Sequence, residues 1–157
     1  MKKDAFSGCS KLTSITIPDT VTSIGNYAFD GCPIEEATIP TIAISCLPKS
    51  NLRIVTITSG ESIGSGAFSR CSSLTSITIP DSVTSIGERA FSCCWSLTRI
   101  TIGNSVSIGY YVVAYCNKLT NINYSGTIEE WQSKGDRWKY STSISCIVHC
   151  ADGDINI

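Results

Sequence analysis

The chain has little excess charge, a single histidine and no long apolar run. Its 157 residues include 12 Lys and Arg against 13 Asp and Glu, so the formal net charge is −1 at pH 7. Nucleic acids and anionic membrane surfaces are bound by clustered Lys and Arg, and this balance therefore argues against both kinds of partner. The one histidine, His149, has no Ser or Cys elbow beside it and no recognisable acidic partner, so no catalytic triad is expected.

The longest apolar stretches are only a few residues long, so no membrane insertion is expected. The start of the chain also lacks an apolar segment that could act as a signal peptide, because the first three residues lead directly into Asp4. Ala5 and Phe6 already have the form of a repeat element that recurs further along. We therefore expect the chain to start in the middle of a repeat and to be a fragment of a longer protein.

What the chain does contain is a repeated pattern. The motif Ala-Phe-x-x-Cys begins at Ala28, Ala67 and Ala90, and each copy is followed by a run of the form Leu/Ile-x-x-apolar-x-Ile. Residues 74–87 (LTSITIPDSVTSIG) nearly duplicate residues 12–25 (LTSITIPDTVTSIG). A period of 20–25 residues is typical of a solenoid, in which small units stack on one another. Such a fold presents an extended surface rather than a pocket, and this favours binding over catalysis.

The apolar positions of each unit predict one short strand per coil. The last two apolar residues of each unit are two apart and mostly β-branched, so they share one face of a strand. A Pro-Asp turn, a second short extended piece (Val21 to Ile24, Val83 to Ile86) and the Ala-Phe segment follow, the last too short for more than about one or two helical turns. We predict an α/β repeat solenoid over residues 1–124, with parallel strands and a period of 22–23 residues. The six units begin at Leu12, Ile34, Leu52, Leu74, Leu97 and Leu119.

Two units depart from the pattern. The unit from Ile34 to Asn51 is only 18 residues long and has Ser45-Cys46-Leu47-Pro48 in place of the Ala-Phe element, which predicts a compressed coil or a local bulge. In the fifth unit, Val112 and Val113 replace Ala-Phe, so the filling residue differs but stays apolar.

Residues 125–157 are predicted to cap the solenoid. An exposed solenoid end leaves apolar faces and strand edges open, so terminal units are atypical. Thr127 and Glu130 have the spacing of a capping box at the start of a short helix. Trp131 and Trp138 are expected to cover the last coil. The stretch from Ile144 to His149 is predicted to form a final strand, and Asp152-Gly153 a turn. The N-terminal side has no such cap, so we expect an exposed first coil that frays or self-associates.

The frame L-x-x-I-x-I-P-x-x-V-x-x-I-G-x-x-A-F-x-x-C, clearest between Phe68 and Cys94, resembles the BspA-like (Treponema pallidum-type) leucine-rich repeat family. The tail is similar to the C-terminal end of that family, through Tyr124 to Thr127, both tryptophans and the segment from Val148 to Gly153. The resemblance implies a right-handed leucine-rich-repeat coil with short helical or irregular convex segments. It also implies a cell-surface or secreted bacterial protein that takes part in adhesion or host-protein binding. It supplies no catalytic residue and no cofactor.

The nine cysteines fall mostly into one column. Five of them precede a predicted strand by two or three residues, where a thiol acts as a small buried apolar group. Disulfides between coils stay open as an alternative, although in-register stacking rarely gives the Cβ directions that a bridge needs. Cys146, His149 and Cys150 loosely resemble metal ligands, but on a strand His149 points away from the other two, so no metal site is expected. The column is Cys9, Cys32, Cys71, Cys94 and Cys116.

The outward strand positions are the candidate binding residues. A threonine-rich strand face is by itself consistent with a solvated surface whose hydroxyls bond along the column. The functional interpretation is a flat or concave polar face that docks a host extracellular-matrix or bacterial surface protein, and the alternative is a structural spacer that binds nothing. An enzyme would need convergent titratable groups, which the sequence does not indicate. The predicted binding positions are Ser14, Thr16, Glu36, Thr38, Thr56, Ser76, Thr78, Arg99, Thr101, Asn121 and Asn123, with Ile54 interrupting one column.

Overall fold

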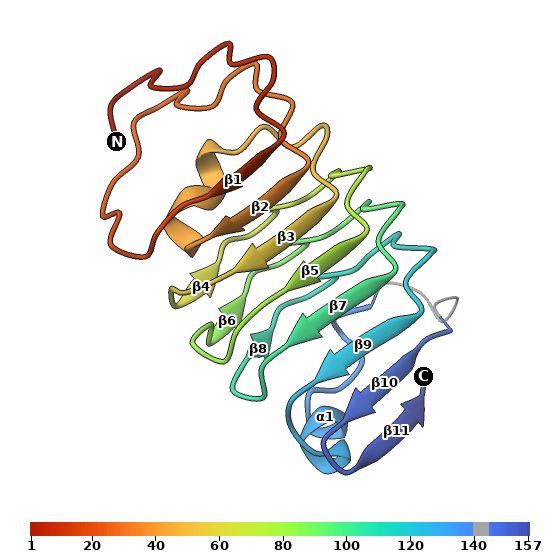
Figure 1. The fold of residues 1–157 in the computed structure, drawn as a ribbon. Coiled ribbons are helices and arrows are strands. Elements are labelled where there is room, and N and C mark those ends of the chain that lie inside the picture. Colours follow the sequence, from red (N-terminus) through yellow and green to blue (C-terminus); the bar gives the residue numbers. More distant parts are fainter. Residues whose placement is uncertain (140–144) are drawn as a thin grey trace.

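A computed structural model describes residues 1–139 and 145–157. The chain winds into a solenoid in which the main strand of each coil pairs with that of the next (Figure 1). Eight strands form one sheet in the order β1-β2-β3-β5-β7-β9-β10-β11. All neighbours are parallel up to β10, and β11 then pairs antiparallel with β10. The strands are β1 (Ser14–Thr16), β2 (Glu36–Ile39), β3 (Ile54–Ile57), β5 (Ser76–Thr78), β7 (Arg99–Ile102), β9 (Asn121–Tyr124), β10 (Ile147–Cys150) and β11 (Gly153–Asn156).

A second, smaller sheet forms where the sequence predicted another extended piece. It consists of β4 (Ser62–Ile63), β6 (Ser85–Ile86) and β8 (Ser107–Ile108), all parallel. The predicted piece from Val83 to Ile86 is therefore shorter as a strand. The stretch from Val21 to Ile24 forms no strand, because the next coil has a helix after its main strand instead of an extended segment.

A convex segment of consecutive turns, not a helix, contains the Ala-Phe motif. Around Phe29, the amides of Ala28, Asp30 and Cys32 each donate to the carbonyl three residues earlier, at 3.1–3.3 Å. Tyr27 and Gly31 flank this segment with φ values of 58° and 72°. The same two left-handed positions recur in every regular convex segment. These segments are Asp4–Gly8, Tyr27–Gly31, Gly66–Arg70, Arg89–Cys93 and Tyr111–Tyr115.

The short unit from Ile34 to Asn51 contains a helix rather than a bulge. The 3-10 helix η1 (Thr41–Cys46) takes the place of the convex segment ahead of β3. Its Ala43 and Ile44 are buried, so they fill the position of the missing Phe. The coil is thus shortened by a helix, in which the chain is wound more tightly than in the convex segments of the other units.

The core is a column of apolar side chains between the sheets and the convex segments. Phe6 stacks on Phe29 with ring centroids 5.5 Å apart, and Phe68 stacks on Phe91 at 5.6 Å. Phe29, Phe68 and Phe91 are completely buried, and burial of each such side chain stabilises the fold by about 1.5–3 kcal/mol. In the last regular coil, where Val113 replaces the Phe, its side chain is buried as well.

All nine cysteines are free thiols, and four of the five predicted column members are buried. Cys32, Cys94 and Cys116 donate hydrogen bonds of 3.0–3.1 Å to the carbonyl of Phe6, Phe68 and Phe91, respectively. Each acceptor belongs to the preceding coil. Cys9 is exposed, which corrects the prediction for this residue: no earlier coil covers it.

The C-terminal cap contains the predicted helix start. Helix α1 (Ile128–Ser133) begins with a capping box in which the Glu130 amide donates to Thr127 Oγ1 at 3.2 Å and the Thr127 amide donates to Glu130 Oε2 at 2.8 Å. Trp131 and Trp138 are buried, with their rings 5.3 Å apart, and Trp131 also meets Tyr124 edge to face.

The last strand and its turn are shifted relative to the prediction. The strand runs from Ile147 to Cys150, and Ile144, where it was predicted to begin, lies outside the described residues. The turn of the hairpin is Ala151-Asp152, because Gly153 already pairs with Cys150. No helix within the described ranges is long and apolar enough to cross a bilayer.

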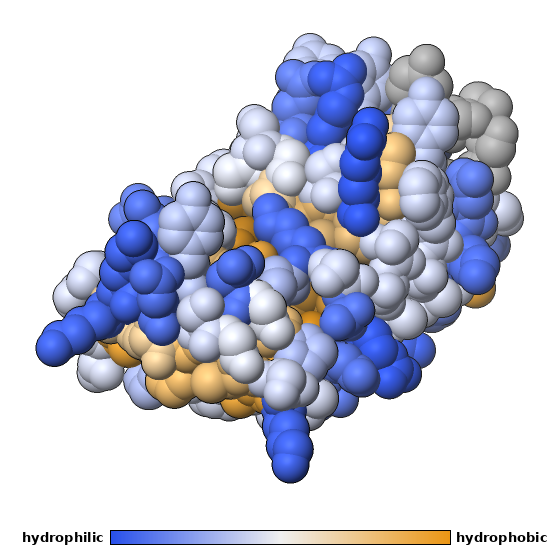
Figure 2. Space-filling model, turned by 90° about the horizontal axis from the view of Figure 1, so that it is seen from above, coloured by the Kyte–Doolittle hydropathy of each residue, from blue (hydrophilic) through white to orange (hydrophobic). Residues whose placement is uncertain are grey.

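The first coil is largely exposed. Met1 and Phe6 are each 41% accessible, and the side chains of Leu12 and Ile15 are only partly covered. Seen from above, apolar surface is visible at the end of the solenoid opposite the grey residues (Figure 2).

Candidate functional site

The strand register brings all the predicted binding residues onto one face of the large sheet. Inward residues such as Val55, Ile77 and Ile100 are buried, whereas the residues between them are exposed or partly exposed. The pairing places them in two parallel columns. One column is Ser14, Glu36, Ile54, Ser76, Arg99 and Asn121, and the other is Thr16, Thr38, Thr56, Thr78, Thr101 and Asn123.

The cap extends both columns, which the sequence reasoning missed. Ile147 pairs with Asn121 and His149 with Asn123, so both side chains of β10 join the face. On β11, Asn156 and Asp154 continue the columns. The signal was present in the sequence, since Ile147-Val148-His149 repeats the outward–buried–outward order of Asn121-Ile122-Asn123.

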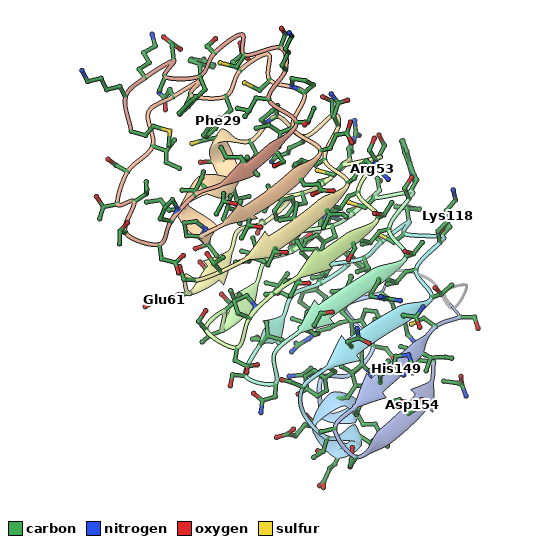
Figure 3. The ribbon with its side chains drawn as sticks, in the orientation of Figure 1. Phe29, Arg53, Glu61, Lys118, His149 and Asp154 are labelled. Carbon is green, nitrogen blue, oxygen red and sulfur yellow. The ribbon has the colours of Figure 1, made fainter. Side chains whose placement is uncertain are left out.

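His149 has an acidic partner after all. Its Nδ1 lies 2.9 Å from Asp154 Oδ1 across the hairpin, and its Nε2 lies 3.1 Å from Asn121 Oδ1 (Figure 3). The amide group of Asn121 donates to Thr120 Oγ1 at 2.9 Å, which orients its oxygen toward the ring. Since both ring nitrogens face oxygen acceptors, only the imidazolium form donates both bonds. The arrangement joins β9, β10 and β11 at the surface.

Two charged side chains on the face are without an ionic partner. Glu36 and Arg99 are exposed, and neither forms an ion pair within residues 1–139 and 145–157. They are three strand steps apart in the same column, which corresponds to roughly 14 Å. By contrast, Arg53 forms an ion pair with Glu35 at 3.3 Å. These two residues lie in neighbouring coils, each one position before the first outward residue of its strand. The unpaired charges are therefore available to a partner.

The hydroxyls of the central threonine column are also available. In the row just before the strands, Thr75 and Thr98 donate to carbonyls of the preceding coil at 2.9 and 3.1 Å. Thr38, Thr56 and Thr78 make no comparable side-chain bond in the described part of the chain. The expected hydroxyl ladder thus forms one row away from the predicted binding column.

The face offers no metal-like or catalytic grouping. Among the described residues, no group of three His, Cys, Asp or Glu side chains could hold a metal ion. Burial raises the pKa of Cys146 to about 11, which keeps this thiol protonated. Its side chain points inward from the start of the strand, away from His149. The face can therefore offer hydrogen bonds, two charges and the exposed side chains of Ile54 and Ile147.

Comparison with known families gives a match over most of the chain. The family model described as BspA type leucine rich repeat region matches residues 1–51 and 41–149, in six copies. A search of curated proteins finds no match.

Solved structures of bacterial repeat proteins are similar in fold. A leucine rich cell surface protein from Faecalibacterium prausnitzii A2-165 is 27% identical, with a TM-score of 0.64 over 84% of this chain and 36% of that one. A leucine-rich repeat protein from Bacteroides ovatus ATCC 8483 is 23% identical, with a TM-score of 0.55 over 93% of this chain and 44% of that one. A leucine-rich repeat protein of T. pallidum is 32% identical, with a TM-score of 0.43 over 78% of this chain and 50% of that one. The chain spans less than half the length of the first two proteins.

Proposed function

The chain belongs to the family of BspA-type leucine-rich repeat proteins, and from this membership we propose that its strand face binds another protein without catalysing a reaction. The observation that carries the proposal is the unpaired state of the outward side chains. Among the residues that the structure describes, Glu36 and Arg99 are exposed without ionic partners, and the hydroxyls of Thr38, Thr56 and Thr78 form no side-chain hydrogen bond.

The chemistry of the face suits a protein partner. Arg is enriched among the residues that dominate protein–protein binding energy, and Arg99 lies near the middle of its column. Ile54, 41% accessible, lies between Glu36 and Ser76 and supplies an apolar contact in a polar surround. Charges of opposite sign at fixed separation select a partner with the complementary order of charges.

The place of action is proposed from the relatives. The protein of Faecalibacterium prausnitzii is described as a cell surface protein. We place the present chain at the cell surface or outside the cell, with adhesion or host-protein binding as its role. Its partner would be a host extracellular-matrix protein or a surface protein of another bacterium.

A binding screen with matched variants tests the proposal. The protein is immobilised and exposed to a panel of purified extracellular-matrix and bacterial surface proteins, and every binder is measured again with the variant Arg99→Glu/Thr78→Lys. We expect an affinity loss of at least tenfold, because the central charge is reversed and a long cation is placed beside it.

The control variant Lys118→Glu/Ser107→Lys makes the same charge changes away from the strand face. Lys118 lies in the turn before β9, and Ser107 belongs to the small sheet; both are exposed. Unchanged affinity of the strand-face variant would contradict the proposal. Absence of any binder across the panel would favour the alternative, a structural spacer.

A further inference from the structure

The regular convex segments are joined to one another by main-chain hydrogen bonds. Between Gly66–Arg70 and the next coil, the amides of Gly66, Phe68 and Arg70 donate to the carbonyls of Glu88, Ala90 and Ser92 at 2.7–2.9 Å. The amides of Arg89, Phe91 and Cys93 do the same toward Tyr110, Val112 and Ala114 at 2.8–3.0 Å. Each convex segment thus offers amides from alternate residues to carbonyls of the next convex segment, which follows the same series of turns.

This ladder is interrupted at the short coil. The amides of Tyr27, Phe29 and Gly31 occupy the donor positions of their segment, yet none of them donates to an atom among residues 1–139 and 145–157. The reason is η1, which satisfies its own main chain: the amide of Ala43, for example, donates to the carbonyl of Pro40 at 3.0 Å. Tyr27 is 64% accessible and Gly31 is exposed, so these donors are open to the outside.

A cleft borders the interrupted ladder at Tyr27 and Asp30. Its volume is 370 Å³, within the range of ligand-binding clefts. Asn26, Tyr27 and Asp30 form one wall, and residues 45–48 at the end of η1 form the other. The 18-residue unit is too short to close this space, because a regular unit has four or five residues more.

We propose that this cleft binds a peptide segment that carries a basic side chain and adopts the turns of a convex segment. Carbonyls of the peptide would accept from the amides of Tyr27 and Gly31, as those of the next convex segment do in the regular units, so that the peptide adds to the convex ladder. In the regular units the outer acceptors, such as Glu88 and Ser92, are four residues apart, so the peptide spans about five residues. The carboxylate of Asp30 is exposed on the cleft wall and forms no ion pair in the described ranges, which selects a cation and disfavours an anion.

This site goes beyond the proposed function of the strand face. Its residues belong to a convex segment and to η1, and none of them is part of the two strand columns. Loss of binding at one site therefore leaves the other testable.

A peptide titration followed by NMR tests the site. The probe is the acetylated and amidated hexapeptide Gly-Glu-Arg-Ala-Phe-Ser, the sequence of residues 87–92, which in the intact fold supplies carbonyls to Gly66 and Arg70. We expect saturable shifts of the Tyr27 and Gly31 amide signals and at least threefold slower exchange of these amides with solvent. A second probe with Lys in place of Glu should bind several-fold more tightly.

Three variants make the result decisive. Asp30→Lys should abolish the preference for the more basic peptide, and Asn26→Trp should fill the cleft and weaken binding at least tenfold. Ser65→Trp is the matched control, because Ser65 lines a different cleft on the opposite side of η1. Thermal unfolding of each variant shows that it is folded.

Several outcomes would overturn the proposal. These are an absence of shifts at Tyr27 and Gly31 at the highest peptide concentration, shifts confined to the strand face, and equal weakening by Asn26→Trp and Ser65→Trp. Concentration-dependent broadening of the two signals without peptide would assign the cleft to a second copy of the chain instead.

Discussion

The thiol of Cys94 donates a hydrogen bond of 3.1 Å to the carbonyl of Phe68, one coil earlier. Cys116 and Phe91 repeat the relationship, so each of these two cysteines donates to a carbonyl of the preceding coil that also accepts from a main-chain amide. The cysteines of the repeat are therefore structural, although their number would suggest disulfides in a small extracellular domain.

Replacement of Cys94 by Ala should destabilise the protein by about 0.5–1.5 kcal/mol, because it removes one of the two hydrogen bonds to the Phe68 carbonyl, which then accepts only from the Cys71 amide. The measurement is urea unfolding followed by circular dichroism. Cys9→Ala serves as the control: the Cys9 thiol is exposed, and its loss should change the free energy of unfolding by less than about 0.5 kcal/mol. Equal effects of the two substitutions would contradict a structural role for the column.

Thiol reactivity should separate the cysteines into two groups. The thiols of Cys116 and Cys71, together with burial, raise the pKa of the Cys94 thiol, and burial raises that of Cys146 to about 11. In a native titration with a disulfide reagent, Cys9 should react first, and the five buried thiols should react only after denaturation. Fast reaction of all nine in the native protein would rule out the buried column.

The raised pKa of Cys146 also predicts a loss of stability at alkaline pH. The unfolded thiol ionises near its ordinary pKa of 9.0, whereas the folded one stays protonated up to about pH 11. The contribution of the protonated Cys146 thiol to the free energy of unfolding is thus fully present below pH 9. It is lost as the pH rises through the pKa of the folded state. Unfolding midpoints between about pH 8 and 11 should fall less steeply for Cys146→Val than for the unchanged protein; identical slopes would assign the loss to other groups.

The lowered pKa of Asp19 predicts a loss of stability at acidic pH, in contrast to the alkaline loss expected from Cys146. Its carboxylate accepts hydrogen bonds from Thr58 Oγ1 at 2.5 Å and from Ser59 Oγ at 2.7 Å, and these two hydroxyls lower its pKa from 3.8. The stabilisation is present above pH 3.8 and is lost as the pH falls through the folded pKa. Asp19→Asn should therefore destabilise the protein at neutral pH and lose its effect in strong acid. Asp30→Asn is the control, because Asp30 is exposed and forms no ion pair in the part of the chain that the structure describes.

The cap should be essential to the C-terminal end of the solenoid. Trp131→Ala removes a buried ring that contacts both Tyr124 and Trp138, and a loss of about 3–5 kcal/mol is expected. Thr127→Ala, which removes only the helix cap, should cost about 1 kcal/mol. Chemical unfolding measures both, with the exposed Gln132→Ala as the control. A Trp131→Ala variant as stable as Gln132→Ala would contradict the capping role.

The sequence was sufficient to predict the regular coils, because the two-residue spacing of Ile77 and Ile79 sets which side of each strand is buried. It could not show that η1 replaces the convex segment, since a run such as Thr41–Cys46 has neither the length nor the apolar period of an ordinary helix. The contribution of His149 and Asp154 to the face was missed for a similar reason. The contact between these two side chains depends on the register of the antiparallel hairpin. That register is set by a turn that lies one residue earlier than predicted.

The interruption of the convex ladder at η1 affects how the protein unfolds. The stacked rings of Phe6 and Phe29 are separated from those of Phe68 and Phe91, and the convex ladder does not cross the gap. The two blocks are joined through the pairing of β2 with β3 and the main-chain bonds that flank it, through the ion pair of Arg53 with Glu35, and through the bonds of Asp19 to Thr58 and Ser59. In a linear array of nearest-neighbour contacts, such a weak junction divides the cooperative unit. Hydrogen exchange should therefore reveal an N-terminal block that opens at a lower free energy than the rest, and Asp19→Asn should widen that difference.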